Sequence, residues 1–193
     1  MDGMMCFQLL SLIFILIFYS VAEYLIQKHF HPKTTKFSSF LLTRDYLIAY
    51  TIGFTEYLIE RYFFPSKSDP HSIIIYIGLL MEFIGLYIRF SAILHAGKSF
   101  NHIIQTNKSP EHKLVTDGIY KYFRHPSYFG FFLFAVGTQV MLKNIFSVIG
   151  FIVVLWRFFD SRIRFEEQTL INMFGKDYIE YKKRTPTWIP FIK

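Results

Sequence analysis

Residues 7–26 have the sequence FQLLSLIFILIFYSVAEYLI, in which Glu23 is the one charged residue. A helix of about 20 apolar residues crosses the hydrocarbon core of a bilayer, so this stretch predicts a transmembrane helix. A cleaved signal peptide would carry positive charge before its apolar run. Here Asp2 comes before the run and the first lysine, Lys28, comes after it. We therefore expect a helix that is retained.

The composition of the whole chain agrees with a membrane protein. Of the 193 residues, 52% are hydrophobic, 20% are aromatic and only 18% are charged. Disordered chains have few aromatic residues and many charges, so this composition excludes disorder and argues against a soluble domain. The net charge of +7 fits basic loops beside a membrane better than a nucleic-acid surface. The single cysteine, Cys6, excludes a disulfide framework and a thiolate zinc cluster.

Further apolar stretches cover about 46–64 and 72–94, and a longer one covers 126–159. The polar pair Lys143-Asn144 lies in the middle of the longest stretch and predicts a tight helical hairpin. We expect an all-α integral membrane protein with about five transmembrane helices and an amphipathic C-terminal helix. The first half would hold three of these spans, in residues 1–94. The second half, 95–193, would hold the polar segment 95–125, the hairpin and the charged tail 160–193.

The positions of lysine and arginine predict the orientation in the membrane. With five spans, 17 of the 21 basic residues fall on one side, in the 28–44 loop, the 95–125 segment and the stretch from Arg157 onward. Cytoplasmic loops carry the excess of such residues. We expect the 95–125 segment and the tail to face the cytosol together, with the N-terminus on the opposite side.

Two polar segments on the predicted cytosolic side contain the candidate site. In the first, 101–128, Pro126 occupies a favoured first position of a helix, whose unpaired N–H groups can receive an acceptor-rich ligand. In the second, 156–170, Arg162 and Glu166 are four residues apart and share one helical face. A surface ion pair is the alternative for these two residues. The spacing of the histidines matches no zinc pattern, so we expect no metal. For four further ionisable residues we expect pairing between helices: Glu56, Glu60, Glu82 and Arg89.

These segments together resemble a known family. The matching stretches are 97–105 (GKSFNHIIQ), 112–120 (HKLVTDGIY), 124–130 (RHPSYFG), 137–139 (GTQ), 156–159 (WRFF), Arg162 with Glu166-Glu167, 174–178 (FGKDY) and 181–184 (YKKR). In this order and spacing they look like isoprenylcysteine carboxyl methyltransferases. The resemblance is dense over 95–193, about half of the chain. Three predicted helices precede this half, whereas animal members carry additional N-terminal spans.

The resemblance implies an enzyme of the endoplasmic reticulum that methylates the C-terminal carboxylate of prenylated CaaX proteins, such as small GTPases, with S-adenosylmethionine as the methyl donor. Arg162 would bind the substrate carboxylate, and Arg162 and Glu166 would form the catalytic pair. It also implies a set of residues that hold the donor: Gln105, His112, Lys113, Leu114, Val115, Tyr120, His125, Pro126, Ser127, Tyr128 and Glu166. At Lys113 only the backbone is implicated, because the position is variable.

Three alternatives remain open at this stage. A phospholipid N-methyltransferase would share the donor but would methylate an amine, for which no arginine is needed. A relative of sterol reductases would use a nicotinamide cofactor, and more spans would be expected. A membrane scaffold without activity would tolerate the loss of Arg162, Glu166 or His125.

Overall fold

The computed structural model describes residues 3–35, 43–64, 72–104 and 113–192. Throughout these ranges the regular elements are helices, as the sequence predicts. The long ones are α1 (Gly3–Phe30), α2 (Arg44–Phe63), α3 (Ile73–Ala96), α4 (Pro126–Leu142) and α5 (Ile145–Phe174). A short helix, α6 (Lys176–Arg184), and two 3₁₀ turns, η3 (Gly97–Ser99) and η4 (Gly118–Lys121), complete the set. The stretch 65–71, PSKSDPH, consists largely of turn formers and predicts a loop, but it lies outside the described residues.

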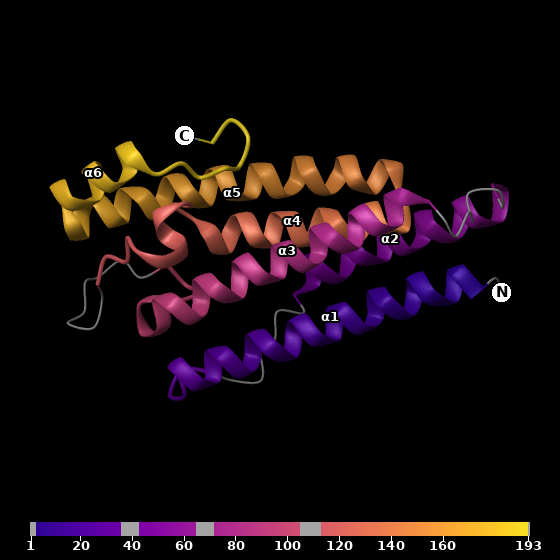
Figure 1. The fold of residues 1–193 in the computed structure, drawn as a ribbon, viewed down its shortest axis with the longest axis horizontal. Helices are drawn as coiled ribbons and strands as arrows, with labels where there is room; N and C mark the ends of the chain where they lie inside the picture. Colours follow the sequence, from indigo (N-terminus) through magenta and orange to yellow (C-terminus); the bar gives the residue numbers. More distant parts are fainter. Residues whose placement is uncertain (1–2, 36–42, 65–71, 105–112, 193) are drawn as a thin grey trace.

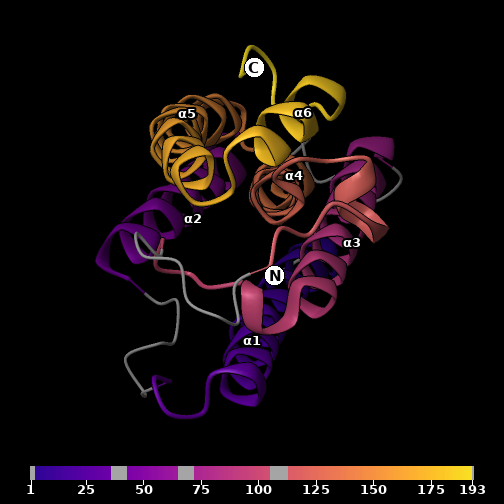
Figure 2. The ribbon, with the colours of Figure 1, turned by 90° about the vertical axis from the view of Figure 1, so that its left-hand side faces the viewer.

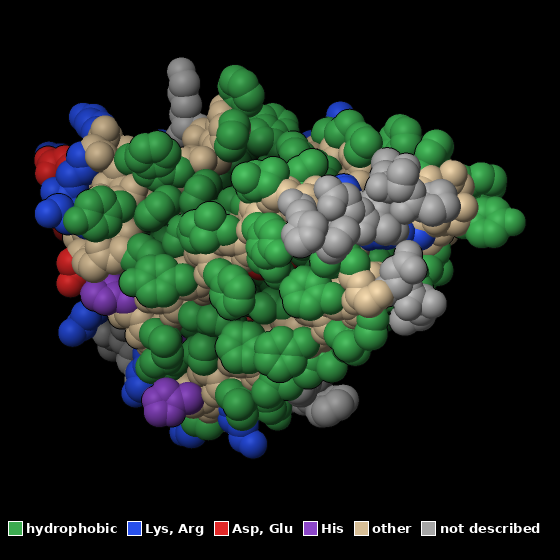
Figure 3. All heavy atoms as spheres, turned by 45° about the vertical axis from the view of Figure 1, so that its right-hand side comes forward, with side chains coloured by type: hydrophobic (Ala, Val, Ile, Leu, Met, Phe, Trp, Pro, Cys, Tyr) green, Lys and Arg blue, Asp and Glu red, His purple; other side chains and the backbone are tan. Residues whose placement is uncertain are grey.

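The long helices run side by side in alternating directions, so both polar segments of the second half lie at one end (Figure 1). Seen along the bundle, α4 lies between α3 and α5 (Figure 2), and α6 packs beside the last turns of α5 (Figure 1). Much of the lateral surface is apolar, and many of the visible charged side chains gather at one end (Figure 3). Two helices, Gly3–Phe30 and Ile73–Ser99, are long and apolar enough to cross a membrane, and Pro126–Leu142 is a shorter apolar helix.

The closest helix contact joins α3 to α4 through glycines. A Cβ atom added to Gly85 would lie 2.6 Å from the carbonyl oxygen of Gly130, and one added to Gly130 would lie 2.6 Å from that of Gly85. Farther along the helices, a Cβ atom added to Gly78 would lie 2.3 Å from the backbone nitrogen of Met141, and one added to Gly137 would lie 3.0 Å from the carbonyl oxygen of Gly78. Because a side chain at these positions would force the backbones apart, the glycines fix how the start of α4 sits against the end of α3.

The predicted hairpin is present, with Lys143 in the left-handed region (φ 64°) between α4 and α5. The side-chain amide of Asn144 donates to the carbonyl of Gly53 at 2.8 Å and thereby ties the turn to α2. The Glu56 carboxylate accepts from the backbone N–H groups of Phe146 and Ser147 at 2.8 and 2.7 Å. A carboxylate at a helix N-terminus is favourable, so α2 caps the first turn of α5.

Helix α5 joins the predicted hairpin to the predicted tail. It continues past 159 to Phe174, where Gly175 (φ 56°) ends it. Residues 157–174 contain no glycine or proline, and Ile163 continues the buried stripe of Phe159. The charged tail therefore begins as the last turns of α5 and continues into α6. After α6 the chain turns back along α5 (Figure 1) and buries Ile189 and Ile192 against Phe159 and Ile163.

Candidate active site

A pocket of about 140 Å³ opens at the end of the bundle where the two polar segments meet. Its walls come from the end of α3 and η3, the 113–115 segment, η4, the first turn of α4, the last turns of α5, and α6. All nine described residues of the predicted donor-binding set line it: Lys113, Leu114, Val115, Tyr120, His125, Pro126, Ser127, Tyr128 and Glu166. The other two predicted residues, Gln105 and His112, lie outside the described residues.

The first turn of α4 forms one wall of the pocket. As the sequence predicts, the helix begins at Pro126, and His125 stands at the N-cap without a side-chain cap bond. The His125 ring is buried and stacks on the Tyr128 ring at 5.5 Å with an interplanar angle of 3°. On its other face, Tyr128 stacks on Phe159 of α5 at 5.1 Å. This stack fixes the Tyr128 ring, so its hydroxyl has a defined place between α4 and α5.

The Tyr128 hydroxyl connects the two predicted catalytic residues. It donates to the Glu166 carboxylate at 2.5 Å and accepts from Nε of Arg162 at 2.8 Å. The Arg162 guanidinium also lies over the Tyr128 ring, 5.5 Å from its centre, and donates from Nη2 to the carbonyl of His102. Among the described contacts Arg162 and Glu166 do not form the surface ion pair considered from the sequence. Glu166 lines the pocket, whereas Arg162 lies beside it, next to Tyr128.

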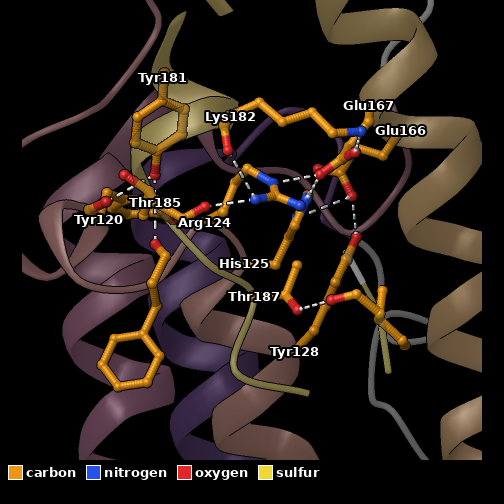
Figure 4. Close-up of polar contacts among 12 residues, drawn as sticks. Tyr120, Arg124, His125, Tyr128, Glu166, Glu167, Tyr181, Lys182, Thr185 and Thr187 are labelled. Carbon is orange, nitrogen blue, oxygen red and sulfur yellow. Dashed lines mark hydrogen bonds and ion pairs between the residues drawn. The ribbon is translucent and has the colours of Figure 1, made fainter. Parts of the chain in front are cut away.

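A second group of charges, around Glu167, supports the first turn of α4 (Figure 4). Glu167 is buried and accepts from Nε of Arg124, from Nε2 of His125 at 3.2 Å and from Nζ of Lys182 at 2.5 Å. Burial alone would raise the pKa of Glu167, but the hydrogen bonds and charges of these three partners lower it to about 2. The network thus holds His125 by a carboxylate that stays ionised at neutral pH.

Arg124 ties this network to the end of the chain. Its Nη1 donates to the carbonyl of Thr185, and its backbone N–H donates to the carbonyl of Pro186 at 2.8 Å. Sequence reasoning did not assign a role to Arg124 or Glu167, although both lie within motifs that it identified. Helical spacing could have marked Glu167, because it follows the buried Phe159 and Ile163 at intervals of four.

On the opposite wall, η4 brings Tyr120 to the pocket. Its hydroxyl donates to the carbonyl of Ala92 at 3.3 Å, and its own carbonyl accepts from the Tyr181 hydroxyl at 2.7 Å. Burial, with a contribution from the charge of Glu166, raises the pKa of Tyr120 above its usual value of 10.0. Tyr120 therefore stays neutral and can pack on or hydrogen-bond to a ligand.

The described residues contain no group of three histidine, cysteine, aspartate or glutamate side chains that could hold a metal ion. His95, one of the histidines in the polar segment, instead faces the exposed Asp117 at 3.0 Å. The hydrogen bond from His95 lowers the pKa of Asp117 below its usual value of 3.8. This pair closes the turn before η4, where Gly118 has a φ of 54° and packs against the His95 ring.

Comparison with known proteins identifies the family of this chain. The model of the isoprenylcysteine carboxyl methyltransferase (ICMT) family matches residues 77–172. Protein-S-isoprenylcysteine O-methyltransferase B of Arabidopsis thaliana is 42% identical over 186 residues, which are 96% of this chain and 94% of that protein. The chain belongs to the isoprenylcysteine carboxyl methyltransferase family.

Longer members of the family match as well. The Xenopus laevis protein-S-isoprenylcysteine O-methyltransferase is 43% identical over 91% of this chain, which corresponds to 62% of the frog protein. A solved structure of a eukaryotic intramembrane Ras methyltransferase of this family has a TM-score of 0.88 at 38% identity. It covers 92% of this chain, and the match spans 64% of that protein. The likeness therefore reaches well beyond the 95–193 half in which the sequence motifs are dense.

In this member of the methyltransferase family, the pocket extends past the part that the family model matches. That match ends at residue 172, but Tyr178 and Tyr181 of α6 line the pocket. Lys182 is one of the three partners of Glu167. Helix α6 is thus part of the site, although it lies after the residues that the family model matches.

Proposed function

We propose that this chain transfers a methyl group from S-adenosylmethionine to the C-terminal carboxylate of a prenylated cysteine. The observation that carries this proposal is the arrangement around Tyr128. One hydroxyl holds a carboxylate that lines the pocket, Glu166, and an arginine beside the pocket, Arg162. A cationic donor and an anionic acceptor would each find an opposite charge within reach of the same hydroxyl. The names of the relatives support an isoprenylcysteine acceptor.

The residues of the pocket fit S-adenosylmethionine. Glu166 presents a carboxylate, which suits the positive charge of a sulfonium or an ammonium group. Nη2 of Arg124, another lining residue, is buried without a hydrogen-bond partner in the described part of the chain, so an acceptor on the ligand would satisfy it. Leu114, Val115 and Met173 offer apolar surface for an adenine ring. When bound, S-adenosylmethionine supplies an electrophilic methyl group.

The acceptor needs orientation more than activation. A C-terminal carboxyl group has a pKa near ~3.5, so it is an anion at neutral pH and requires no general base. The planar fork of Arg162 can hold such a carboxylate by two hydrogen bonds, which a lysine would not reproduce. Alignment of two reactants can supply ~7–11 kcal/mol of a reaction barrier. We assign this alignment to Arg162 on the acceptor side and to Glu166 on the donor side.

The proposal extends to the membrane arrangement. The apolar parts of helices α1 to α5, up to about residue 159 in α5, are the five spans, and the end of the bundle with the pocket faces the cytosol at the endoplasmic reticulum. Residues 1–94 then form the N-terminal helices and residues 95–193 the catalytic half. The apolar lateral surface and the concentration of basic residues in the loops at the pocket end support this orientation. A soluble donor would enter from the cytosol, and a prenylated protein of the small GTPase type would enter from the bilayer.

The second candidate is a phospholipid N-methyltransferase with the same donor. Its acceptor amine must lose a proton, and it has no use for an arginine that holds an anion. The contacts of Arg162 and the names of the relatives favour the carboxylate acceptor.

The experiment that tests the proposal measures methyl transfer in membranes that contain the chain. Labelled S-adenosylmethionine and N-acetyl-S-farnesylcysteine are supplied, and Arg162→Ala serves as the control. We expect base-labile label on the farnesylcysteine with the wild-type chain and its loss in the control. Label in the lipid fraction instead would support the phospholipid reaction. Absence of transfer by folded protein would contradict both and leave a reductase or a scaffold.

A further inference from the structure

A buried chain of contacts leads from α1 to Arg162. Glu23 of α1 is 2% exposed and accepts from Nε of Arg89 on α3. Its second carboxylate oxygen lies 3.1 Å from Nε2 of His102, within ion-pair distance, and has no hydrogen-bond partner in the described part of the chain. The carbonyl of His102 in turn accepts from Nη2 of Arg162. One carboxylate in the first helix is therefore two contacts away from the arginine beside the pocket.

Stability alone does not account for this cluster. Taking a carboxylate and a guanidinium out of water is costly, and an apolar pair of similar size often serves a fold equally well. Ionisable groups inside membrane helices are rare and are found where a function needs them. Arg89 also donates from Nη1 to the backbone and side-chain oxygens of Ser127 at 3.1 and 3.2 Å, and Ser127 lines the pocket. The cluster thus reaches the site by two routes.

The contact with the His102 carbonyl helps to set the orientation of the Arg162 guanidinium. An arginine side chain has five N–H donors. The protein uses Nε on the Tyr128 hydroxyl and Nη2 on the His102 carbonyl, so both contacts together fix the plane of the fork. The Tyr128 hydroxyl is held in place because its ring is stacked between other rings. The His102 carbonyl, by contrast, belongs to an irregular segment that follows η3. Glu23 and His31, the residue directly after α1, hold this segment, since His31 Nε2 lies 2.7 Å from the carbonyl of Phe100.

We propose that Glu23 is a positioning residue for recognition of the acceptor carboxylate. It holds His102, and through the His102 carbonyl it sets the orientation in which Arg162 meets the substrate. The inference rests on the proposed function, because it takes Arg162 as the group that binds the carboxylate. It assigns to α1, which supplies no residue to the pocket wall, a defined part in substrate binding.

Glu23→Gln tests this role with a minimal change of shape. The glutamine oxygen can still accept from Arg89, but the variant removes the negative charge that lies beside Nε2 of His102. We expect the KM for N-acetyl-S-farnesylcysteine to rise about tenfold, as for the loss of one hydrogen bond to a charged group. The dissociation constant of S-adenosylmethionine should change less than about threefold. Glu82→Gln is the matched control, because Glu82 is a buried carboxyl in α3 that does not line the pocket.

Two further variants separate positioning from folding. His102→Ala removes the imidazole that Glu23 holds without placing a new group in the membrane helices, and it should raise the same KM. In an Arg162→Lys background, Glu23→Gln should add less than about a twofold effect, because residues that act through one another are not additive. A purely structural role would lower the amount of folded protein and leave the KM of the remainder unchanged.

The outcomes distinguish the inference from the function on which it rests. If the wild-type chain does not methylate the farnesylcysteine, the proposed function fails, and the role of Glu23 falls with it. If the wild type is active but Glu23→Gln and His102→Ala keep its KM, only the positioning role is wrong. Full additivity with Arg162→Lys would likewise overturn the route through His102.

Discussion

Glu56 and Glu166 lie at opposite ends of the helix bundle, and the protein uses their hydrogen-bonding capacity to different extents. Glu56 accepts from the N–H groups of Phe146 and Ser147 and also from the Ser147 hydroxyl at 2.5 Å. Glu166 accepts from the Tyr128 hydroxyl, and Nδ1 of His125 lies 4.0 Å from its carboxylate, the nearest nitrogen of a basic side chain in the described part of the chain. The first carboxylate completes a helix start, whereas the second faces a pocket.

The difference shows what separates a structural polar group from a candidate functional one. Both residues are partly buried glutamates within helices, so exposure and residue type do not distinguish them. They differ in how many hydrogen bonds each carboxylate accepts from other groups of the protein. Three donors from one helix start serve Glu56, whereas among the described residues Glu166, which lines the pocket, accepts from the Tyr128 hydroxyl. Substitutions at the two ends should accordingly affect different measurements.

The largest effect should follow from Arg162→Lys. A lysine keeps the charge but not the fork, and each hydrogen bond to a charged group contributes ~1.5–3 kcal/mol. We expect kcat/KM for N-acetyl-S-farnesylcysteine to fall about 100-fold, with the donor affinity nearly unchanged. Initial rates at varied acceptor concentration measure this. The matched control is Arg164→Lys, since Arg164 is exposed and pairs with Asp160 at 3.0 Å. Equal losses in both variants would remove Arg162 from acceptor binding.

A smaller effect, on the donor, should follow from Glu166→Gln. The variant keeps the size of the side chain but removes the charge that would face a cationic ligand. We expect the dissociation constant of S-adenosylmethionine to rise about tenfold, equivalent to ~1.4 kcal/mol, and Glu166→Ala to weaken binding at least as much. Equilibrium binding of labelled donor to purified protein measures this directly. Unchanged affinity in both variants would show that Glu166 is not the counter-charge.

At the other end, Glu56→Gln should leave the site alone. The amide can replace only part of the three contacts at the start of α5, so the free energy of unfolding should fall by ~1–2 kcal/mol. The dissociation constant of the donor and the KM of the acceptor should stay within about twofold of wild type. Thermal unfolding in detergent, together with the two binding measurements, checks both parts. A loss of donor affinity here as large as in Glu166→Gln would contradict the separation of the two ends.

Much of this organisation could be predicted from the sequence, because it is local. The lengths of the apolar stretches predicted where α1, α2 and α3 lie, and the polar pair Lys143-Asn144 predicted the hairpin. Pro126 gave the start of α4. The resemblance identified nine residues that line the pocket, because a sequence motif fixes both the side chains and the local turn that positions them. The change from apolar to charged residues near 159 predicts a boundary between hairpin and tail, and the structure joins the two in one helix because no residue there breaks it.

The pairings between distant helices could not be predicted. Periodicity shows which face of a helix is buried, but it does not show which helix meets that face. Arg89 does pair between helices as expected, yet its partner Glu23 is 66 residues away. Glu56 pairs with backbone N–H groups rather than with a charge, and an oxygen of the buried Glu82 has no hydrogen-bond partner in the described part of the chain. Partner choice depends on which helices pack together, and only the fold reveals that.

The smallest expected effect concerns pH and the network around Glu167, which lies beyond the apolar part of α5. Its pKa is lowered from 4.5 to about 2 in the folded protein. A carboxyl group with a depressed pKa stabilises the fold at every pH above its unfolded value, and the contribution is lost as pH falls toward the folded value. Between pH 5 and 8 the stabilisation that Glu167 contributes should therefore stay constant.

A comparison of wild type with Glu167→Gln isolates this titration from that of other groups. A protonated carboxyl group resembles an amide, so the difference in thermal midpoint should be constant from pH 8 to 5 and should close between about pH 4.5 and 2. Lys182→Met removes one of the partners that lower the pKa of Glu167, so in that background the difference should close at higher pH. A difference that widens on acidification would mean that Arg124, His125 and Lys182 do not hold Glu167 as an anion. The support for the first turn of α4 would then have to come from the Arg124 contacts with the tail alone.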